Sequence, residues 1–421
     1  MTTPDSRVSA RTTGSADQAL VARAAALLHT NGQSTAVTLA AVDRLNTGLG
    51  TGFTLIPSWT SSTLLGAAVT PLITAAPPTS VAMRSVAAVM TAVDAVADRR
   101  AGRAELTEAL DRASGSRPVP LGIFVLACAT GASALSIIFG AEDATAVILV
   151  ALSAALGGLL RRFLARLGTG AIGQVFAAAF LAGVIGGIAV NADLSSSLRL
   201  IAVCPAMILV PGPHILNGTL DVLSARIPLG FARLGYAAVL LVAIASGLAI
   251  ALTLLGTDLP VAPTGRSVDL WLDVLAAAIA AASYSIYFAM PYRFIVWPVL
   301  VGAAAHALRW WVLTDFGANI AVGAFVACLL VGIVLSPIAA RLHIPFAAVA
   351  FASVVSLIPG VYVFRMLDAL ATLPSGGEPT MLVGAISDGT TAALIVLGMA
   401  VGLALPRHIY GQIVELRRTP R

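Results

Sequence analysis

The 421-residue chain contains no lysine and few charged residues of any kind. Charged side chains make up 11% of the sequence, whereas soluble domains carry about 25%. Hydrophobic residues make up 58%. This balance excludes an ordinary soluble protein and indicates a membrane protein. The 25 basic residues are all arginine, a bias that is typical of a GC-rich genome and that indicates no particular chemistry.

Cysteine is equally scarce. Cys128, Cys204 and Cys328 each lie inside an apolar run, and no two of them have CxxC spacing. Neither a zinc site nor a disulfide framework is indicated, and we expect no metal and no cofactor. The sequence lacks a GxxxxGK[ST] phosphate loop, so ATP-driven transport by this chain is unsupported. The arginines form no basic stripe interleaved with aromatic residues, which argues against nucleic acid as a partner.

The first 117 residues are polar to mixed and lack the short apolar core of a signal peptide. We expect residues 1–15 to be a disordered tail and residues 16–117 to be a small α+β domain in the cytoplasm. Two apolar-periodic segments that end at Gly32 and near Gly48–Gly50 predict helices.

Short strands are predicted after these two helices, at Phe53–Ile56 and Thr63–Thr74, because both segments are rich in Thr, Leu and Val. Helical periodicity returns at 79–99 and 104–113. His29, Ser34 and Asp43 are of the residue types that a hydrolase site uses, but no G-x-S-x-G turn accompanies them. We therefore predict that the chain is not an enzyme.

From Val119 onward the apolar runs approach the length of about 20 residues that a membrane-spanning helix requires. We predict a polytopic α-helical membrane protein with ten transmembrane helices, at 119–139, 144–160, 171–190, 198–216, 229–254, 270–289, 294–312, 318–337, 345–364 and 381–404. Five of them would form a first membrane repeat over 118–256 and five a second over 257–406, followed by a cytoplasmic tail at 407–421.

The placement of arginine predicts the orientation, because cytoplasmic connections are enriched in basic residues. One set of alternate connections holds seven arginines and the C-terminal tail holds four more, whereas the other side holds four at most. The first set consists of Arg161, Arg162, Arg166, Arg226, Arg233, Arg293 and Arg341. The acidic residues of the other set are Glu142, Asp143, Asp193, Asp258, Asp269, Asp315, Asp368 and Glu378. Both termini are therefore expected in the cytoplasm, with the protein in the cytoplasmic (inner) membrane.

A Pro-Gly pair recurs in the fourth span of each half, as Pro211-Gly212 and Pro359-Gly360. LVPGPHILNGTLDVL at 209–223 resembles LIPGVYVFRMLDAL at 357–370. Because each half has five spans, an odd number, the second half would be inverted relative to the first. Inverted repeats with broken helices near the midplane are typical of secondary transporters. The alternative is chance similarity between apolar segments.

The two Pro-Gly pairs would interrupt their helices and free backbone groups for a polar ligand; a simple kink is the alternative. After the first break, His214, Asn217 and Asp221 follow at i, i+3 and i+7 and share one face. Such a face could bind an amino acid, with Asp221 accepting from the ammonium group. Asp221 could instead be solvated at the cytoplasmic surface, and His214 could be structural.

Tyr362 and Arg365 follow the second break, where Arg365 occupies the position that Asn217 has in the first. Arg365 could bind a carboxylate, or it could extend towards the surface near Asp368. His306 lies within the seventh span, and an ionisable residue inside a membrane is by default a candidate functional group. We consider His306 and Asp221 as candidates for coupling to protons; a structural His306 remains the alternative.

These segments together resemble the threonine/serine exporter family over nearly the whole chain. The most specific stretch is PGPHILNGTLDVLSARIPLGFARLGYA, which matches the Pro-Gly, Asn, Asp, Gly and Arg pattern of the family. The matching residues are Pro211, Gly212, Asn217, Asp221, Gly230 and Arg233. ALLHTNGQST and MRSVAAVMTAVDAVADRRAGRAELTEAL resemble parts of the N-terminal domain of the family.

The resemblance implies export of small hydroxyl amino acids from the cytoplasm, driven by the proton-motive force. The expected partners are an amino-acid substrate, the lipid bilayer, protons as the coupling ion and a second copy of the chain in a homo-oligomer. Two other functions stay open: export of another small metabolite such as a dicarboxylate, and a membrane sensor without flux.

Overall fold

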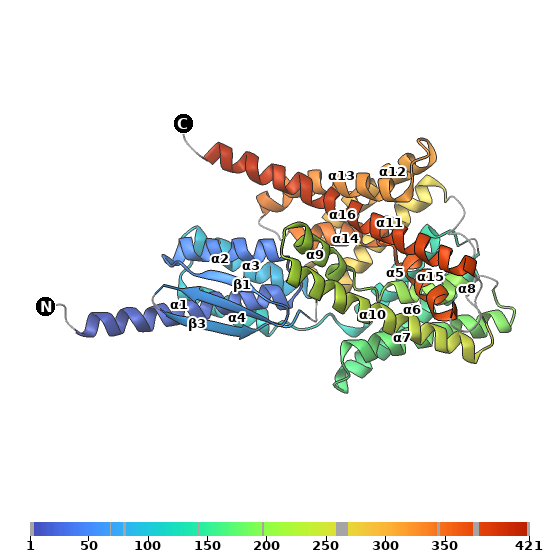
Figure 1. Cartoon of the computed structure of the whole chain (residues 1–421), viewed down its shortest axis with the longest axis horizontal. Coiled ribbons are helices and arrows are strands. Elements are labelled where there is room, and N and C mark those ends of the chain that lie inside the picture. Colours follow the sequence, from blue (N-terminus) through green and yellow to red (C-terminus); the bar gives the residue numbers. More distant parts are fainter. Residues whose placement is uncertain are drawn as a thin grey trace.

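The computed structural model describes residues 4–67, 69–78, 81–141, 143–195, 198–257, 268–342, 346–373 and 379–418. It consists of a small α+β domain beside one end of a large helix bundle (Figure 1). Of the acidic residues that were used for the orientation, Glu142, Asp258 and Glu378 lie outside the described residues.

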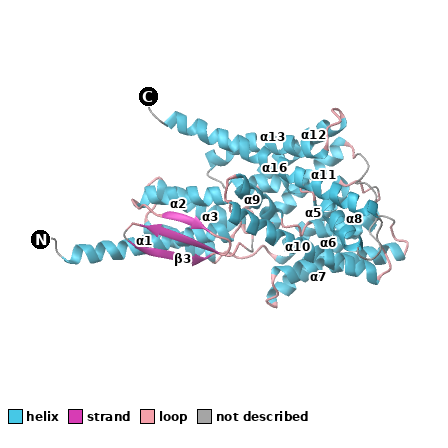
Figure 2. Ribbon diagram, viewed as in Figure 1, coloured by secondary structure: helices cyan, strands magenta, loops and turns pink. Residues whose placement is uncertain are grey.

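The N-terminal domain contains all the strands that the structure describes (Figure 2). Its elements are α1 (Pro4–Thr30), α2 (Thr35–Leu49), β1 (Thr54–Pro57), β2 (Ser61–Gly66), β3 (Val69–Ala75), α3 (Met83–Ala97) and α4 (Arg103–Ser114). The strands form an antiparallel sheet in the order β1-β2-β3. A separate apolar core, with Leu28, Leu45 and Leu106 fully buried, holds the helices to the sheet.

Two details of this domain differ from the sequence expectation. The predicted strand Thr63–Thr74 is two strands, because the chain turns back between Gly66 and Val69 and pairs β2 with β3. Helix α1 begins at Pro4 and so includes most of the segment that was expected to be a disordered tail. Its first turns project beyond the sheet (Figure 1).

The helix bundle begins at α5. Its first set of helices is α5 (Leu121–Ile138), α6 (Ala144–Arg166), α7 (Ala171–Asn191), α8 (Leu198–Met207), α9 (Gly212–Leu223) and α10 (Ile227–Leu254). Its second set is α11 (Leu270–Tyr287), α12 (Val296–Thr314), α13 (Ile320–Leu342), α14 (Phe346–Val354), α15 (Gly360–Thr372) and α16 (Pro379–Arg418). The short 3-10 turns η1 (Tyr292–Phe294) and η2 (Val355–Leu357) precede α12 and α15.

Each of the ten predicted regions overlaps a helix or a bent helix pair of the bundle. Among the described residues, eight helices are long and apolar enough to cross a membrane, and two bent helix pairs, α8–α9 and α14–α15, also qualify if each pair counts as one span. Large apolar side chains such as Leu126, Phe163 and Leu254 are exposed on the outside of the bundle. The protein is therefore a polytopic helical membrane protein.

Each contact between helices of the first set has a counterpart in the second. Helix α7 packs on α10 as α13 packs on α16, and α5 packs on α6 as α11 packs on α12. Helix α10 contacts α15, and α16 contacts α9. The two sets meet through α5 and α11, which occupy equivalent places in them.

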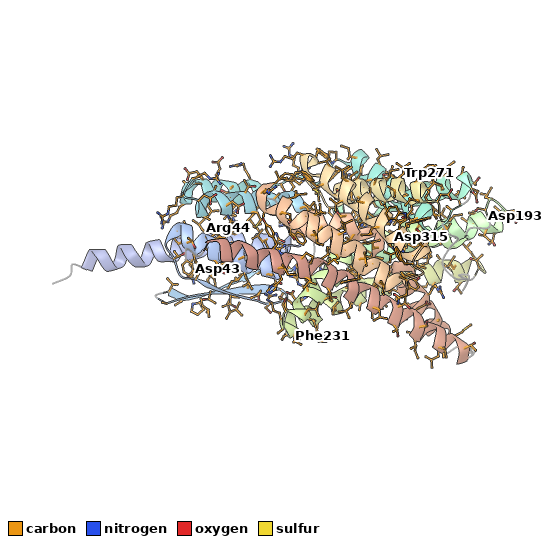
Figure 3. All side chains as sticks on the ribbon, turned by 90° about the horizontal axis from the view of Figure 1, so that it is seen from above. Asp43, Arg44, Asp193, Phe231, Trp271 and Asp315 are labelled. Carbon is orange, nitrogen blue, oxygen red and sulfur yellow. The ribbon has the colours of Figure 1, made fainter. Side chains whose placement is uncertain are left out.

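The two bent pairs point to opposite ends of the bundle (Figure 1). Helix α9 lies next to the N-terminal domain, whereas α15 lies at the far end beside α8. Figure 3 shows Asp193 and Trp271 at that far end. Asp193 belongs to the acidic set of connections, so at least this connection lies at the opposite end of the bundle from the N-terminal domain.

The N-terminal domain is attached to both sets of helices. The amides of Met83 and Arg84, at the start of α3, donate to the carbonyls of Phe288 and Ala289 just after α11, each at 2.9 Å. The turn between α1 and α2 contacts α9, as described below. These contacts place the domain over the end of the bundle at which α9 lies.

Candidate functional site

Both helix breaks have the same backbone geometry. Pro211 has φ −79° and ψ 54°, and Pro359 has φ −78° and ψ 48°. The amide of Gly212 donates to the carbonyl of Val210 and that of Gly360 to Ile358, each at 2.8 Å. Such an i to i+2 hydrogen bond around a residue with these angles is an inverse γ-turn. The chain bends by 57° at the first break and by 51° at the second.

The two breaks contact each other. A Cβ atom added to Gly212 would overlap Ile358 Cδ1, and one added to Gly360 would lie 3.5 Å from Val210 Cγ2. Val210 and Ile358 are the residues that precede the two prolines, so the contact is reciprocal. The sequence prediction that both Pro-Gly pairs interrupt their helices is confirmed.

The polar face of α9 is covered by the N-terminal domain. Asn217 Nδ2 donates to the carbonyl of Gly32 at 3.1 Å, and Thr35 Oγ1 donates to Asp221 Oδ2 at 2.9 Å. Asn217 and Asp221 are 7% and 2% exposed. The alternative that Asp221 is a solvated surface carboxylate is therefore wrong, because the turn Gly32–Thr35 shields it from water.

Arg233 provides the charge that the buried Asp221 requires. Its Nε lies 3.1 Å from Asp221 Oδ2, and its side chain is 0% exposed. Arg226 approaches the other carboxylate oxygen at 3.4 Å. The prediction that Arg233 belongs to a cytoplasmic connection is wrong, because Arg233 lies inside α10, which packs against α9. A carboxylate at this depth is stable only with such a partner.

Arg233 also reaches the N-terminal domain. Its Nη2 lies 3.4 Å from His29 Nδ1 and 3.4 Å from Thr35 Oγ1. Burial and the nearby Arg233 cation lower the pKa of His29 to about 4, although the Trp59 carbonyl opposes this shift. His29 is therefore neutral at pH 7. The α1–α2 turn and the membrane helices thus share one polar network.

His214 lies within an aromatic cluster next to this network, close enough to Arg233 and His29 to interact with them electrostatically. Its ring lies edge-on to Tyr236, with 5.1 Å between centroids, and 6.2 Å from the ring of Trp59 in the N-terminal domain. It is 6% exposed. This environment favours the structural alternative, in which His214 helps to seat Trp59 on the bundle.

A cavity of about 430 Å³ lies between the N-terminal domain, α9, α14 and α16. The residues of α9 that line it include Asn217 and Asp221. Its other polar lining residues are Ser34, Thr35, Ser224, Arg226, Arg407 and His408. The cavity thus offers a carboxylate, guanidinium groups, hydroxyls and an amide, which are the groups that a free amino acid requires.

The second break has a different charged anchor. Arg365 Nε lies 3.0 Å from Asp388 Oδ2 of α16. Their side chains are 24% and 11% exposed, so this pair is more accessible than the pair in the first half. Sequence analysis did not identify Asp388 as a partner, since nothing in the pattern links it to Arg365.

His306 belongs to a buried polar chain beside the second break. Its Nδ1 lies 3.1 Å from Asp273 Oδ2, and its Nε2 lies 2.8 Å from Ser356 Oγ. His306 is 0% exposed. Asp273 was missed because it lies at the start of α11 among apolar residues. Only the fold brings α11, α12 and η2 together.

A second cavity, of about 320 Å³, lies at the second break. It is lined by Pro359, Gly360 and Tyr362, and by Asp273 and Ser356 of the His306 chain; Arg309 also borders it. Tyr362 therefore lies at a cavity, whereas Arg365 is not among the residues that line it. The cavity is at the far end from the N-terminal domain.

Chemistry of other kinds has little support in the described part of the chain. No group of three or more His, Cys, Asp or Glu residues there could hold a metal ion. His29 is buried and bonded to the Trp59 carbonyl, whereas Asp43 lies exposed on the surface of the N-terminal domain (Figure 3). The hydrolase-like residues are therefore not assembled into one site.

Comparison with known families agrees with this architecture. The family model of threonine/serine exporters matches residues 19–255, which include most of the N-terminal domain and α5–α10. A second threonine/serine exporter model matches residues 273–409, most of α11–α16. No solved structure matches the chain. The first match alone covers more than half of the sequence, so the chain belongs to the threonine/serine exporter family, whose members are amino-acid exporters and not enzymes.

Proposed function

We propose that the protein is a secondary active exporter of threonine and serine in the cytoplasmic membrane. The observation that carries this proposal is the pair of cavities at opposite ends of the bundle, each bordered by one of the two broken helices. The breaks touch through Gly212 and Ile358. The two breaks thus lie between the two cavities, and a substrate that moves from one cavity to the other would have to pass them.

The two sets of helices act as inverted repeats in this proposal. The matching contacts within α5–α10 and α11–α16 support it, as do the identical γ-turns at Pro211 and Pro359. Transporters of this kind alternate access by moving one repeat against the other around a fixed site. The N-terminal domain and both termini face the cytoplasm, as the arginine distribution predicts.

The cytoplasmic site is the cavity between the N-terminal domain and α9. Asp221 accepts from both the ammonium group and the hydroxyl of the amino acid, and Arg226 and Arg407 supply donors for the substrate carboxylate. Asn217 can both donate and accept. The family match supports a hydroxyl amino acid as the substrate.

His306, Asp273 and Ser356 form the proton-coupling site. Their hydrogen bonds connect a titratable imidazole to a carboxylate that borders the far cavity. Buried ionisable residues of this kind mark proton pathways in transporters. A proton that enters from the outside can protonate His306 and leave on the return of the carrier.

The test is transport of labelled L-threonine in proteoliposomes under an inward-directed proton gradient. We expect threonine and serine to compete, whereas L-valine and a four-carbon dicarboxylate do not. If only the dicarboxylate competes, the substrate is a dicarboxylate and the assignment of threonine and serine is wrong. Binding of threonine without flux would make the protein a sensor.

Two variants test the assigned residues. Asn217→Ala should abolish flux, while Thr219→Ala, on the same helix and bonded only to its own backbone, should retain it. His306→Gln should leave threonine exchange in place but remove its response to the proton gradient. A gradient response that survives in His306→Gln would contradict the coupling role.

A further inference from the structure

The turn Gly32–Thr35 occupies the face of α9 that the proposed function assigns to the substrate. The Thr35 hydroxyl donates to Asp221 at 2.9 Å, and the Gly32 carbonyl accepts from Asn217 at 3.1 Å. A free hydroxyl amino acid would likewise present a hydroxyl as the donor and a carboxylate oxygen as the acceptor. In this structure, therefore, the turn Gly32–Thr35 makes the hydrogen bonds to Asp221 and Asn217 that a ligand would otherwise make.

We infer that this turn is a tethered substitute for the substrate, which holds the N-terminal domain on α9 until threonine or serine replaces the Thr35 hydroxyl at Asp221. The inference rests on the proposed function and adds a regulatory role for the N-terminal domain. The domain then responds to the cytoplasmic concentration of the substrate itself.

The environment of the Thr35 hydroxyl explains why the replacing group must be a hydroxyl. It lies between Asp221, to which it donates, and Arg233 Nη2, from which it can accept at 3.4 Å. A methyl group in this place would leave buried charged groups short of a partner. Sites built for a hydroxyl reject its apolar analogue for this reason.

The ligand can reach this position through the cytoplasmic cavity. Gly32, Thr35, Asn217 and Asp221 all line the same 430 Å³ space. An amino acid can therefore bind beside the turn before the turn leaves. The rest of the N-terminal domain can stay attached when the turn leaves α9, because the start of α3 remains bonded to Phe288 and Ala289.

The experiment is hydrogen–deuterium exchange of the full-length protein in lipid nanodiscs, with L-threonine, with its near-isostere L-valine, or without ligand. We expect threonine to increase exchange of the amides in residues 29–36 several-fold, and valine to leave it unchanged. Peptides from α4, which lies away from α9, serve as the internal reference. Unchanged or slower exchange in residues 29–36 with threonine would overturn the inference.

Thr35→Val replaces the competing hydroxyl by a methyl group of similar size. It should raise exchange of residues 29–36 without ligand and lower the KM for threonine by about tenfold, the equivalent of one hydrogen bond to a charged group. Thr35→Ser keeps the hydroxyl and should behave like the wild type. Thr47→Val, at an exposed threonine bonded to Asp43, is the matched control. A KM that rises in Thr35→Val would contradict the inference.

Failure of this inference and failure of the proposed function give different results. If threonine is transported but hydrogen exchange in residues 29–36 is unchanged, the inference about the turn is wrong and the proposed function stands. Absence of threonine flux from wild-type proteoliposomes removes the proposed function, whatever the exchange experiment shows.

Discussion

The first broken helix, α8–α9, and the second, α14–α15, share a backbone but differ in their surroundings. The φ and ψ angles of Pro211 and Pro359 agree within a few degrees. Yet α9 carries an acid that is anchored by an arginine on α10, whereas α15 carries an arginine that is anchored by an acid on α16. The break is thus a structural feature common to both halves, and the side chains around it are specialised.

Burial is the second difference between the breaks. The pair Asp221–Arg233 is almost fully buried and covered by the N-terminal domain, whereas Arg365–Asp388 is partly exposed. An electrostatic partner matters most where water is absent. We therefore expect the same substitution to have very different effects in the two halves, and the following experiments test this.

The largest effect is expected for Arg233→Met. It leaves Asp221 buried with only the more distant Arg226, and breaking a buried ion pair costs about 3–5 kcal/mol. Arg365→Met breaks a less completely buried pair and should cost less than Arg233→Met. The measurement is the thermal unfolding midpoint of each purified variant in detergent. Equal losses would mean that the two anchors are equivalent.

A fall in pH should weaken the first half selectively through His29. Its pKa is about 4 in the folded protein and about 6.5 when unfolded. The neutral form of His29 therefore contributes its full share to the free energy of unfolding above pH 6.5. This contribution is lost as the pH falls towards 4, by about 3 kcal/mol in total. The charged or titratable groups that face His29 are Arg233 of α10 and His214 of α9, and Asp221 lies beyond Arg233.

The measurement is the unfolding midpoint of the wild type and of His29→Gln between pH 7 and pH 4.5. The wild type should lose more stability than the variant over this range. Parallel curves would show that His29 does not carry the dependence on pH.

The smallest change in stability is expected when the glycines of the two breaks are replaced by alanine. In Gly212→Ala the new methyl group would overlap Ile358 Cδ1 and lie 3.0 Å from Phe351 Cζ, so some repacking is required, at roughly 1–2 kcal/mol. In Gly360→Ala the nearest atom is Met207 Cε at 3.4 Å, and the change should be almost neutral. Unfolding midpoints measure both. A larger loss in Gly360→Ala would reverse the expected order.

Sequence analysis located the membrane spans, the α+β domain and both breaks because each depends on local pattern. Apolar length marks the spans, and Pro-Gly marks the breaks. The partners of the site residues depend on contacts between distant segments. Thr35 with Asp221, and Asp273 with His306, are separated by 186 and 33 residues, and no local signal in the sequence links them.

The helix that was expected to end near residue 216 also shows the limit of apolar length as a guide. Helix α9 continues to Leu223, past Asn217 and Asp221. These polar residues remain in the helix because Gly32, Thr35 and Arg233 satisfy them. Hydropathy alone therefore ended the predicted span too early.

The reciprocal contact of the two breaks has a mechanical consequence. Gly212 rests on the residue before Pro359, and Gly360 rests near the residue before Pro211. The two bent helix pairs therefore pack against each other at their bends. A change in the angle of either bend thus requires the other bend to move or to repack, because close-packed side chains leave no free space between them.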